Sequence, residues 1–281
     1  MFFNPQDPAF QAVAPFVLSA LLVGVIWFSL KGLRRNFSIV AVAVAILIAY
    51  WLAFSWPPFP PRSSSHKLGY LFLVSAFATL VLAQFGNSSR TALVGNIAVG
   101  LAGIVWLASS KLSQGQFISV GLVCFAAAVA VFGLTSKSNK DVDTGVAILV
   151  AGFALAAVAL LAPSASIAQL SLAICASLGG ILIWNWPKLR MNFLPAGITA
   201  VALPLIWLAS QSSLYSRAND WALAALPLVA FAPWIRSNIV PQSIENSDLL
   251  RPIATGLTAA VLAAPVVLIA FLNRAQDPYL G

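Results

Sequence analysis

Long runs of apolar residues alternate with short polar segments along the whole chain, and this pattern predicts the secondary structure. A run of about 20 apolar residues is long enough for a helix to cross a bilayer, whereas barrel strands would alternate at a period of two. We expect an all-α, polytopic transmembrane helix bundle that forms one integral membrane domain over residues 1–281, with short loops. The predicted spans, about ten in number, are 10–30, 38–56, 68–85, 91–108, 116–134, 144–162, 167–184, 193–210, 221–235 and 252–272.

The tripeptide Trp-Leu-Ala occurs three times, and each copy follows a basic residue by 16 or 17 positions. The pairs are Arg35 with Trp51, Arg90 with Trp106, and Arg190 with Trp207. At about 1.5 Å per residue the separation is about 24 Å, which is most of a hydrocarbon core. We therefore interpret the six residues as interface anchors, with a basic side chain at one membrane surface and a tryptophan at the other.

The sequence also contains a longer internal similarity, between IWFSLKGLRRNF at 26–37 and IWNWPKLRMNF at 183–193. Each segment precedes a span that ends in Trp-Leu-Ala. A duplicated helical hairpin of roughly fifty residues would explain this similarity. Convergence explains it equally well, because apolar spans draw on few residue types, and both explanations stay open.

The composition agrees with a membrane location. Hydrophobic residues make up 60% of the chain and charged residues 8%, and the mean hydropathy is +0.94, whereas soluble domains are about 25% charged. The net charge of +8 does not indicate nucleic acid, because the basic residues are scattered between apolar runs and form no basic stripe. The expected partner is therefore the lipid bilayer, and no nucleic acid is expected.

The distribution of basic residues predicts the orientation, since Lys and Arg favour cytoplasmic loops. Alternate loops hold ten and five of the 15 Lys and Arg residues. The richer set consists of Lys31, Arg34, Arg35, Arg90, Lys137, Lys140, Lys188, Arg190, Arg236 and Arg251. Placing this set in the cytoplasm puts both termini of a ten-span chain on the extracytoplasmic side, and we expect a bacterial inner (plasma) membrane.

Candidate catalytic chemistry is sparse. No ionisable residue lies well inside a predicted span, because Arg90, Asp143, Asp220 and Arg251 lie at span edges and Glu245 lies in a loop. Proton pathways and intramembrane hydrolases need buried ionisable groups, and no metal-ligand spacing, catalytic set or phosphate loop is present. We expect no catalytic residue, metal or cofactor; a lipid-modifying enzyme that uses loop residues is the less favoured alternative.

Four positions inside the spans are candidates for a cavity or a kink, namely Asn96, Pro204, Pro227 and Pro265. Proline kinks a helix by removing a backbone hydrogen bond, and proline-broken spans often line the substrate cavity of transporters. Curvature for packing explains the prolines equally well. Asn96 lies among small residues, where a hydrogen bond to a neighbouring helix is favoured over a contact with a substrate.

Two functions fit these features. The first is a permease or exporter of a neutral or amphipathic small molecule or lipid, without charge coupling inside the membrane. The second is a non-catalytic subunit, anchor or assembly component of a larger membrane complex, with loops 56–67 and 237–247 as docking sites for a membrane-protein partner. If the protein transports, the four candidate positions should line one common cavity.

Overall fold

The computed structural model describes residues 8–29, 34–85, 89–135, 141–187, 190–193, 195–216 and 218–274. Within these ranges all regular elements are helices, and no strand is present. Eight helical stretches of this described part are long and apolar enough to cross a membrane. For these residues the prediction of an all-α structure is confirmed, and the apolar helices indicate an integral membrane protein.

The helices in chain order are α1 (Pro8–Ser29), α2 (Arg34–Phe54), α3 (Ser64–Phe85), α4 (Ser89–Leu107), α5 (Ser109–Ser113), α6 (Phe117–Leu134), α7 (Asp141–Leu161), α8 (Ala165–Trp184), the π-helix η1 (Ile198–Ala202), α9 (Leu203–Tyr215), α10 (Asp220–Ala225), the 3₁₀-helix η2 (Leu226–Phe231), α11 (Ala232–Ile239), α12 (Gln242–Glu245) and α13 (Leu250–Arg274).

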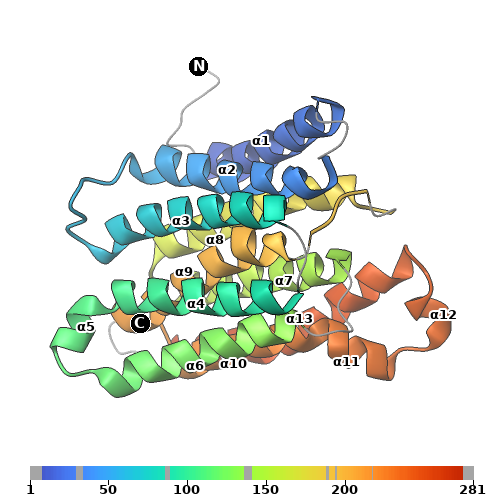
Figure 1. Cartoon of the computed structure of the whole chain (residues 1–281). Coiled ribbons are helices and arrows are strands. Elements are labelled where there is room, and N and C mark those ends of the chain that lie inside the picture. Colours follow the sequence, from blue (N-terminus) through green and yellow to red (C-terminus); the bar gives the residue numbers. More distant parts are fainter. Residues whose placement is uncertain are drawn as a thin grey trace.

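The long helices lie side by side, with α5 at one end of the bundle and α12 at the other (Figure 1). Helix α1 packs on α2 and α8, α7 lies against α8 and α13, and α4 packs on α6. The stretch of η1 and α9, Ile198–Tyr215, has 78% of its residues buried and contacts α3, α4, α6, α7 and α8. It therefore forms the centre of the bundle.

The eighth predicted span, 193–210, is displaced by five residues from the observed helical stretch Ile198–Tyr215. Met191 and Phe193 are apolar and buried, but they lie in an irregular segment. The side-chain oxygen of Asn185 accepts hydrogen bonds from the backbone N–H groups of Arg190 (3.2 Å) and Met191 (2.9 Å). The Asn185 side chain thus gives the backbone N–H groups of Arg190 and Met191 the acceptor that a helix would otherwise provide. The segment can therefore be non-helical although its apolar residues at 191 and 193 are buried.

The ninth predicted span, 221–235, is observed as the succession α10, η2 and α11. Pro227 lies in the first turn of η2, and Pro233 lies in the first turn of α11. A proline lacks the N–H that a continuous α-helix needs. The stretch therefore changes from α-helix to 3₁₀-helix and back, and this irregular segment forms a wall of the pocket described below.

Close contacts between helices depend on small residues. A Cβ atom at Gly180 of α8 would lie 2.9 Å from the backbone N of Ala20 and the backbone O of Phe16 in α1. Beside this contact, Ser19 Oγ donates to the backbone O of Ser177 at 2.7 Å. Small residues and interhelical hydrogen bonds are the usual means of helix association in lipid.

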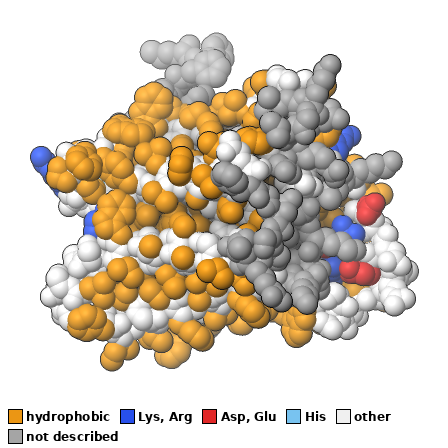
Figure 2. Space-filling view, in the orientation of Figure 1, with side chains coloured by type: hydrophobic (Ala, Val, Ile, Leu, Met, Phe, Trp, Pro, Cys, Tyr) orange, Lys and Arg blue, Asp and Glu red, His pale blue; other side chains and the backbone are white. Residues whose placement is uncertain are grey.

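Apolar side chains cover much of the visible side of the bundle, while basic side chains lie toward both of its ends and acidic side chains toward one end (Figure 2). Phe28, Phe77 and Leu257 are among the large apolar residues exposed on helix surfaces. Extended apolar surface of this kind marks an interaction with lipid or another protein. The surface is compatible with contact between the helices and a lipid bilayer.

Candidate functional site

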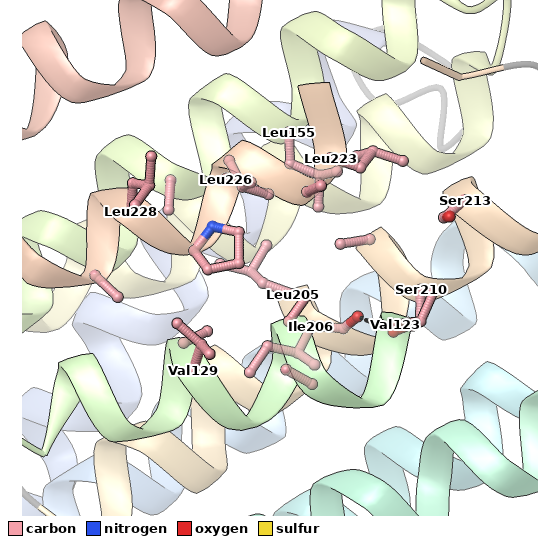
Figure 3. Close-up of a pocket in the computed structure, with 18 of the residues that line it drawn as sticks. Val123, Val129, Leu155, Leu205, Ile206, Ser210, Ser213, Leu223, Leu226 and Leu228 are labelled. Carbon is pink, nitrogen blue, oxygen red and sulfur yellow. Dashed lines mark hydrogen bonds between the residues drawn. The ribbon is translucent and has the colours of Figure 1, made fainter. Parts of the chain in front are cut away.

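An apolar pocket of about 540 Å³ lies between α6, α7, α9, α10 and η2 (Figure 3). Leu155 of α7, Leu205 and Ile206 of α9 and Leu226 of η2 contribute to its walls. Small-molecule sites in proteins have volumes of about 300–1,000 Å³ and mainly apolar walls. The pocket is therefore large enough to hold a ligand.

The pocket opens sideways, between α6 and the stretch formed by α10 and η2. Its lining includes Leu122 and Phe125 of α6, Trp221 of α10 and Leu228 of η2, and all four side chains are exposed on the outside of the bundle. In a membrane protein this side faces hydrocarbon. A molecule dissolved in the bilayer could thus enter the pocket without crossing water.

The polar side chains of the lining gather at one end of the pocket. They are Ser119, Ser210, Ser213 and Asp220. Ser213 Oγ donates to Asp220 Oδ1 at 2.9 Å. In Figure 3, Ser210 and Ser213 lie at the opposite end from Val129 and Leu228. The lining is therefore polar at one end and apolar at the other.

Local sequence explains how Asp220 reaches this place. Asn219 caps α10, because its side-chain oxygen accepts a hydrogen bond from the backbone N–H of Ala222 at 3.0 Å. Asparagine is a favoured residue at this position, and an acidic residue in the first turn is stabilised by the helix dipole. The cap starts α10 beside the end of α9, which carries Ser213.

A second polar feature, the charge cluster, lies where α7, α11, α12 and α13 meet. The side chain of Arg236 is fully buried and lies between two carboxylates, with Nη1 3.0 Å from Asp143 Oδ2 and Nη2 2.9 Å from Glu245 Oε2. Arg236 Nη1 also donates to Thr255 Oγ1 at 2.9 Å. Arg251 Nε donates to Asp143 Oδ2 at 3.1 Å. Asp143 therefore bridges two arginines.

The positions of these residues in their helices favour the cluster. Asp143 lies in the first turn of α7, and Arg236 lies in the last turn of α11. The dipole of a helix stabilises an anion at its N-terminus and a cation at its C-terminus. A buried charge also needs a partner, because its isolated transfer from water is very costly. The cluster satisfies both conditions while joining helices that are distant in sequence.

Asp143 and Arg236 lie at the edges of predicted spans, but their side chains are 0% exposed, and this burial was not predicted from the sequence. The residues lie directly beside the predicted spans 144–162 and 221–235, and Arg251 directly precedes the span 252–272. The predicted topology places these three span ends on one side of the membrane. Their opposite charges were thus a signal for an ion pair that the sequence interpretation missed.

Asn96 lies in the interior of the bundle and outside the lining of the apolar pocket. Its side-chain oxygen accepts a hydrogen bond from Thr199 Oγ1 of η1. Ser75 Oγ of α3 donates to the backbone O of Thr199 at 2.6 Å. These bonds join α3, α4 and η1, which agrees with the favoured interpretation of Asn96 as an interhelical contact.

The three proline candidates occupy different surroundings. Pro227 lines the apolar pocket, Pro204 is buried in the first turn of α9, and Pro265 lies on the exposed side of α13. Asn96, Pro204 and Pro265 are not among the residues that line the pocket. The structure therefore brings only Pro227, of the four predicted cavity positions, to this site. The expectation that a transporter would gather all four in one cavity is not met, and the pocket has other residues as most of its lining.

The three tryptophans also differ. Trp51 and Trp106 are exposed, whereas Trp207 is 0% exposed. The indole N–H of Trp207 donates to the backbone O of Gly100 at 3.1 Å, and a side chain at Gly103 would overlap the indole ring. An interface anchor needs its ring among headgroups. Trp207 does not fit that role, because α9 is enclosed by other helices and the ring fills the space beside two glycines of α4.

The basic anchor candidates are described only in part. Arg190 is exposed. Arg35 and Arg90 belong to α2 and α4, but their side chains lie outside the described part of the chain. The interpretation of Arg35, Arg90 and Arg190 as interface anchors stays a prediction.

Together these features define the class of the molecule as a helical membrane protein with a lateral apolar pocket. No protein-family model matches the chain, and a comparison with curated proteins finds no match. Within the described residues, no group of three or more His, Cys, Asp or Glu side chains could hold a metal ion.

Proposed function

We propose that the protein is a multi-pass permease or exporter of an amphipathic small molecule or lipid in a bacterial inner membrane. The observation that supports this proposal is the apolar pocket, which opens sideways and is polar at one end only. A molecule with an apolar part and a polar part matches such a lining. The proposal includes no charge coupling inside the membrane, and the charges of the buried cluster are paired within the protein.

The proposal includes ten spans with both termini on the extracytoplasmic side. Two shorter apolar helices, Val13–Ser29 and Ala92–Leu107, supplement the eight longer candidates. They lie within the predicted spans 10–30 and 91–108. In this topology the charge cluster is at the cytoplasmic end, and the polar end of the pocket is at the extracytoplasmic end. The larger number of basic residues on the cluster's side supports this orientation.

A liposome assay tests the transport proposal. The probes are octyl amphiphiles that carry a nitrobenzoxadiazole group on the chain and an amine, an alcohol or a carboxylate as the head. Dithionite quenches only the outer leaflet, so the slow phase of quenching reports movement across the bilayer. We expect the reconstituted protein to accelerate this phase for at least one probe. Rates equal to those of protein-free liposomes for every probe would refute the proposal.

Matched variants connect the movement to the pocket. Ala151 and Ala130 line the pocket on α7 and α6, and Ala264 lies on the exposed side of α13. We expect Ala151→Phe and Ala130→Phe to return the rate to that of protein-free liposomes, because the added ring fills the pocket. Ala264→Phe should move the probe at the wild-type rate.

A second candidate function, a non-catalytic subunit or anchor of a membrane complex, is favoured by the loop 56–67. Phe59 is 87% exposed there, which leaves an aromatic side chain available to a partner protein. The other docking candidate, loop 237–247, is partly committed to the fold, because Glu245 binds Arg236. Purification in a mild detergent should yield a stoichiometric partner that Phe59→Ser removes; a chain purified alone would refute this candidate.

A further inference from the structure

The hydrogen-bonding capacity at the polar end of the pocket restricts the head group of the ligand. Ser210 Oγ donates its proton to the backbone O of Ile206 at 2.7 Å, and Ser213 Oγ donates to Asp220 Oδ1 at 2.9 Å. A hydroxyl has one proton to donate but two lone pairs to accept with. Both serines therefore present acceptors to the pocket, whereas Ser119 can act in either sense.

Asp220 strengthens this preference. An ionised carboxylate accepts hydrogen bonds and donates none. Among the described residues that line the pocket, Asp220 is the one that carries a charge. A carboxylate or phosphate head would meet a like charge there, and like charges in contact disfavour binding. The polar end therefore matches a head that donates hydrogen bonds and carries no negative charge.

The apolar part of the lining restricts the rest of the ligand. On α6 the lining extends from Ser119 to Leu134, which is about 22 Å at about 1.5 Å per residue. The volume of about 540 Å³ is therefore spread over an elongated space. This leaves room for a single hydrocarbon chain that lies along α6.

We infer that the pocket binds a single-chain amphiphile whose head is an amine or an alcohol. The head lies against Ser213 and Asp220, and the end of the chain lies between Val129 and Leu228, at the opposite end of the pocket (Figure 3). This inference rests on the proposed function, since it names the substrate class of the same pocket. An amine and an alcohol share the donor chemistry that the polar end selects, and the experiment below distinguishes them.

Photolabelling of the purified protein in lipid nanodiscs tests the inference. The probes are dodecyl amphiphiles with an amine, alcohol or carboxylate head, and each is made with a diazirine either at the end of the chain or beside the head. We expect saturable labelling by the amine and the alcohol, and labelling by the carboxylate that is at least about fivefold weaker. Chain-end probes should modify residues at or beside Val129 or Leu228, and head-end probes residues at or beside Ser213 or Asp220.

Variants separate the head preference from the shape of the pocket. Asp220→Asn keeps a carbonyl acceptor but removes the charge, so the labelling ratio of amine to carboxylate should fall at least about fivefold. Asp248→Asn removes an exposed carboxylate beside the charge cluster and should leave the ratio unchanged. Ala151→Phe tests the shape of the pocket instead, because the added ring should lower labelling by every probe, whatever its head.

The outcomes distinguish failure of the inference from failure of the proposed function. Equal labelling by the carboxylate and the amine in the wild-type protein, or chain-end labelling at Ser213, would overturn the inference while leaving an amphiphile in the pocket. Absence of saturable labelling by all three heads, together with unchanged rates in the liposome assay, would overturn both.

Discussion

The charge cluster and the polar end of the pocket each contain an aspartate that accepts hydrogen bonds, but the surroundings of the two carboxylates differ. In the cluster, Asp143 is fully buried and contacts both Arg236 and Arg251. At the pocket, Asp220 is exposed and accepts a hydrogen bond from the hydroxyl of Ser213. One carboxylate has strong protein partners on two sides, whereas the other can still accept hydrogen bonds from a ligand.

This difference separates a structural role from a binding role. Ionisable residues inside membranes are commonly functional, but a buried carboxylate that bridges two arginines has little capacity left for a ligand. The cluster instead joins α7, α11, α12 and α13, and α11 directly follows η2 at the pocket wall. We therefore assign support of the pocket wall to the cluster, and contact with the ligand to Ser213 and Asp220.

The largest expected effect comes from Asp143→Asn. This change leaves Arg236 buried without a carboxylate on one side and also removes the negative charge that pairs with Arg251 Nε. Loss of one partner of a buried ion pair costs about 3–5 kcal/mol. We expect a large decrease in the thermal unfolding midpoint in detergent. A midpoint equal to that of Asp248→Asn, whose carboxylate is 69% exposed, would contradict the structural role of the cluster.

A smaller loss is expected for Glu245→Gln. Its carboxylate contacts Arg236 but is 24% exposed, so water can replace part of the interaction. Hydrogen bonds to charged groups contribute about 1.5–3 kcal/mol, and this exposure places Glu245 at the lower end. The double variant Asp143→Asn with Glu245→Gln should lose less free energy of unfolding than the sum of the losses in the two single variants, because both carboxylates contact Arg236. Strict additivity would show that the two carboxylates act independently.

The smallest effect on stability is expected for Asp220→Asn. Asp220 is exposed and Asn keeps an acceptor for Ser213, so the loss is limited to the interaction of the charge with the N-terminus of α10, about 0.3–1 kcal/mol. The unfolding midpoint of the variant should therefore decrease only slightly. Its effect should instead be on the preference among head groups. A large decrease in midpoint with unchanged labelling would reverse the roles given to the two regions.

Much of the fold could be predicted from hydrophobic patterning, because lipid-exposed helices need long apolar runs. The breaks at Met191 and Pro227 were harder to predict. Burial of the apolar residues before Ile198 depends on the Asn185 side chain, which accepts bonds from Arg190 and Met191. At Pro227 the chain changes to a 3₁₀-helix rather than a simple kink.

The candidate site was less predictable, since it depends on which helices become neighbours. The pocket combines α6 with α9, α10 and η2, and its polar end joins Ser213 to Asp220 across a turn. Trp207 shares its tripeptide with Trp51, but α9 lies in the centre of the bundle and α2 leaves Trp51 exposed. The tripeptide is the same at both tryptophans, and the position of each helix in the bundle decides whether the ring is buried.

The most direct test of the pocket as a single-chain site is native mass spectrometry of the protein with dodecylamine. The pocket is open to the side of the bundle and has room for one hydrocarbon chain. The wild-type protein should therefore saturate at one bound dodecylamine molecule per protein molecule. Ala151→Phe should bind none, and Ala264→Phe should match the wild type. Equal binding by the wild-type protein and Ala151→Phe would contradict the account.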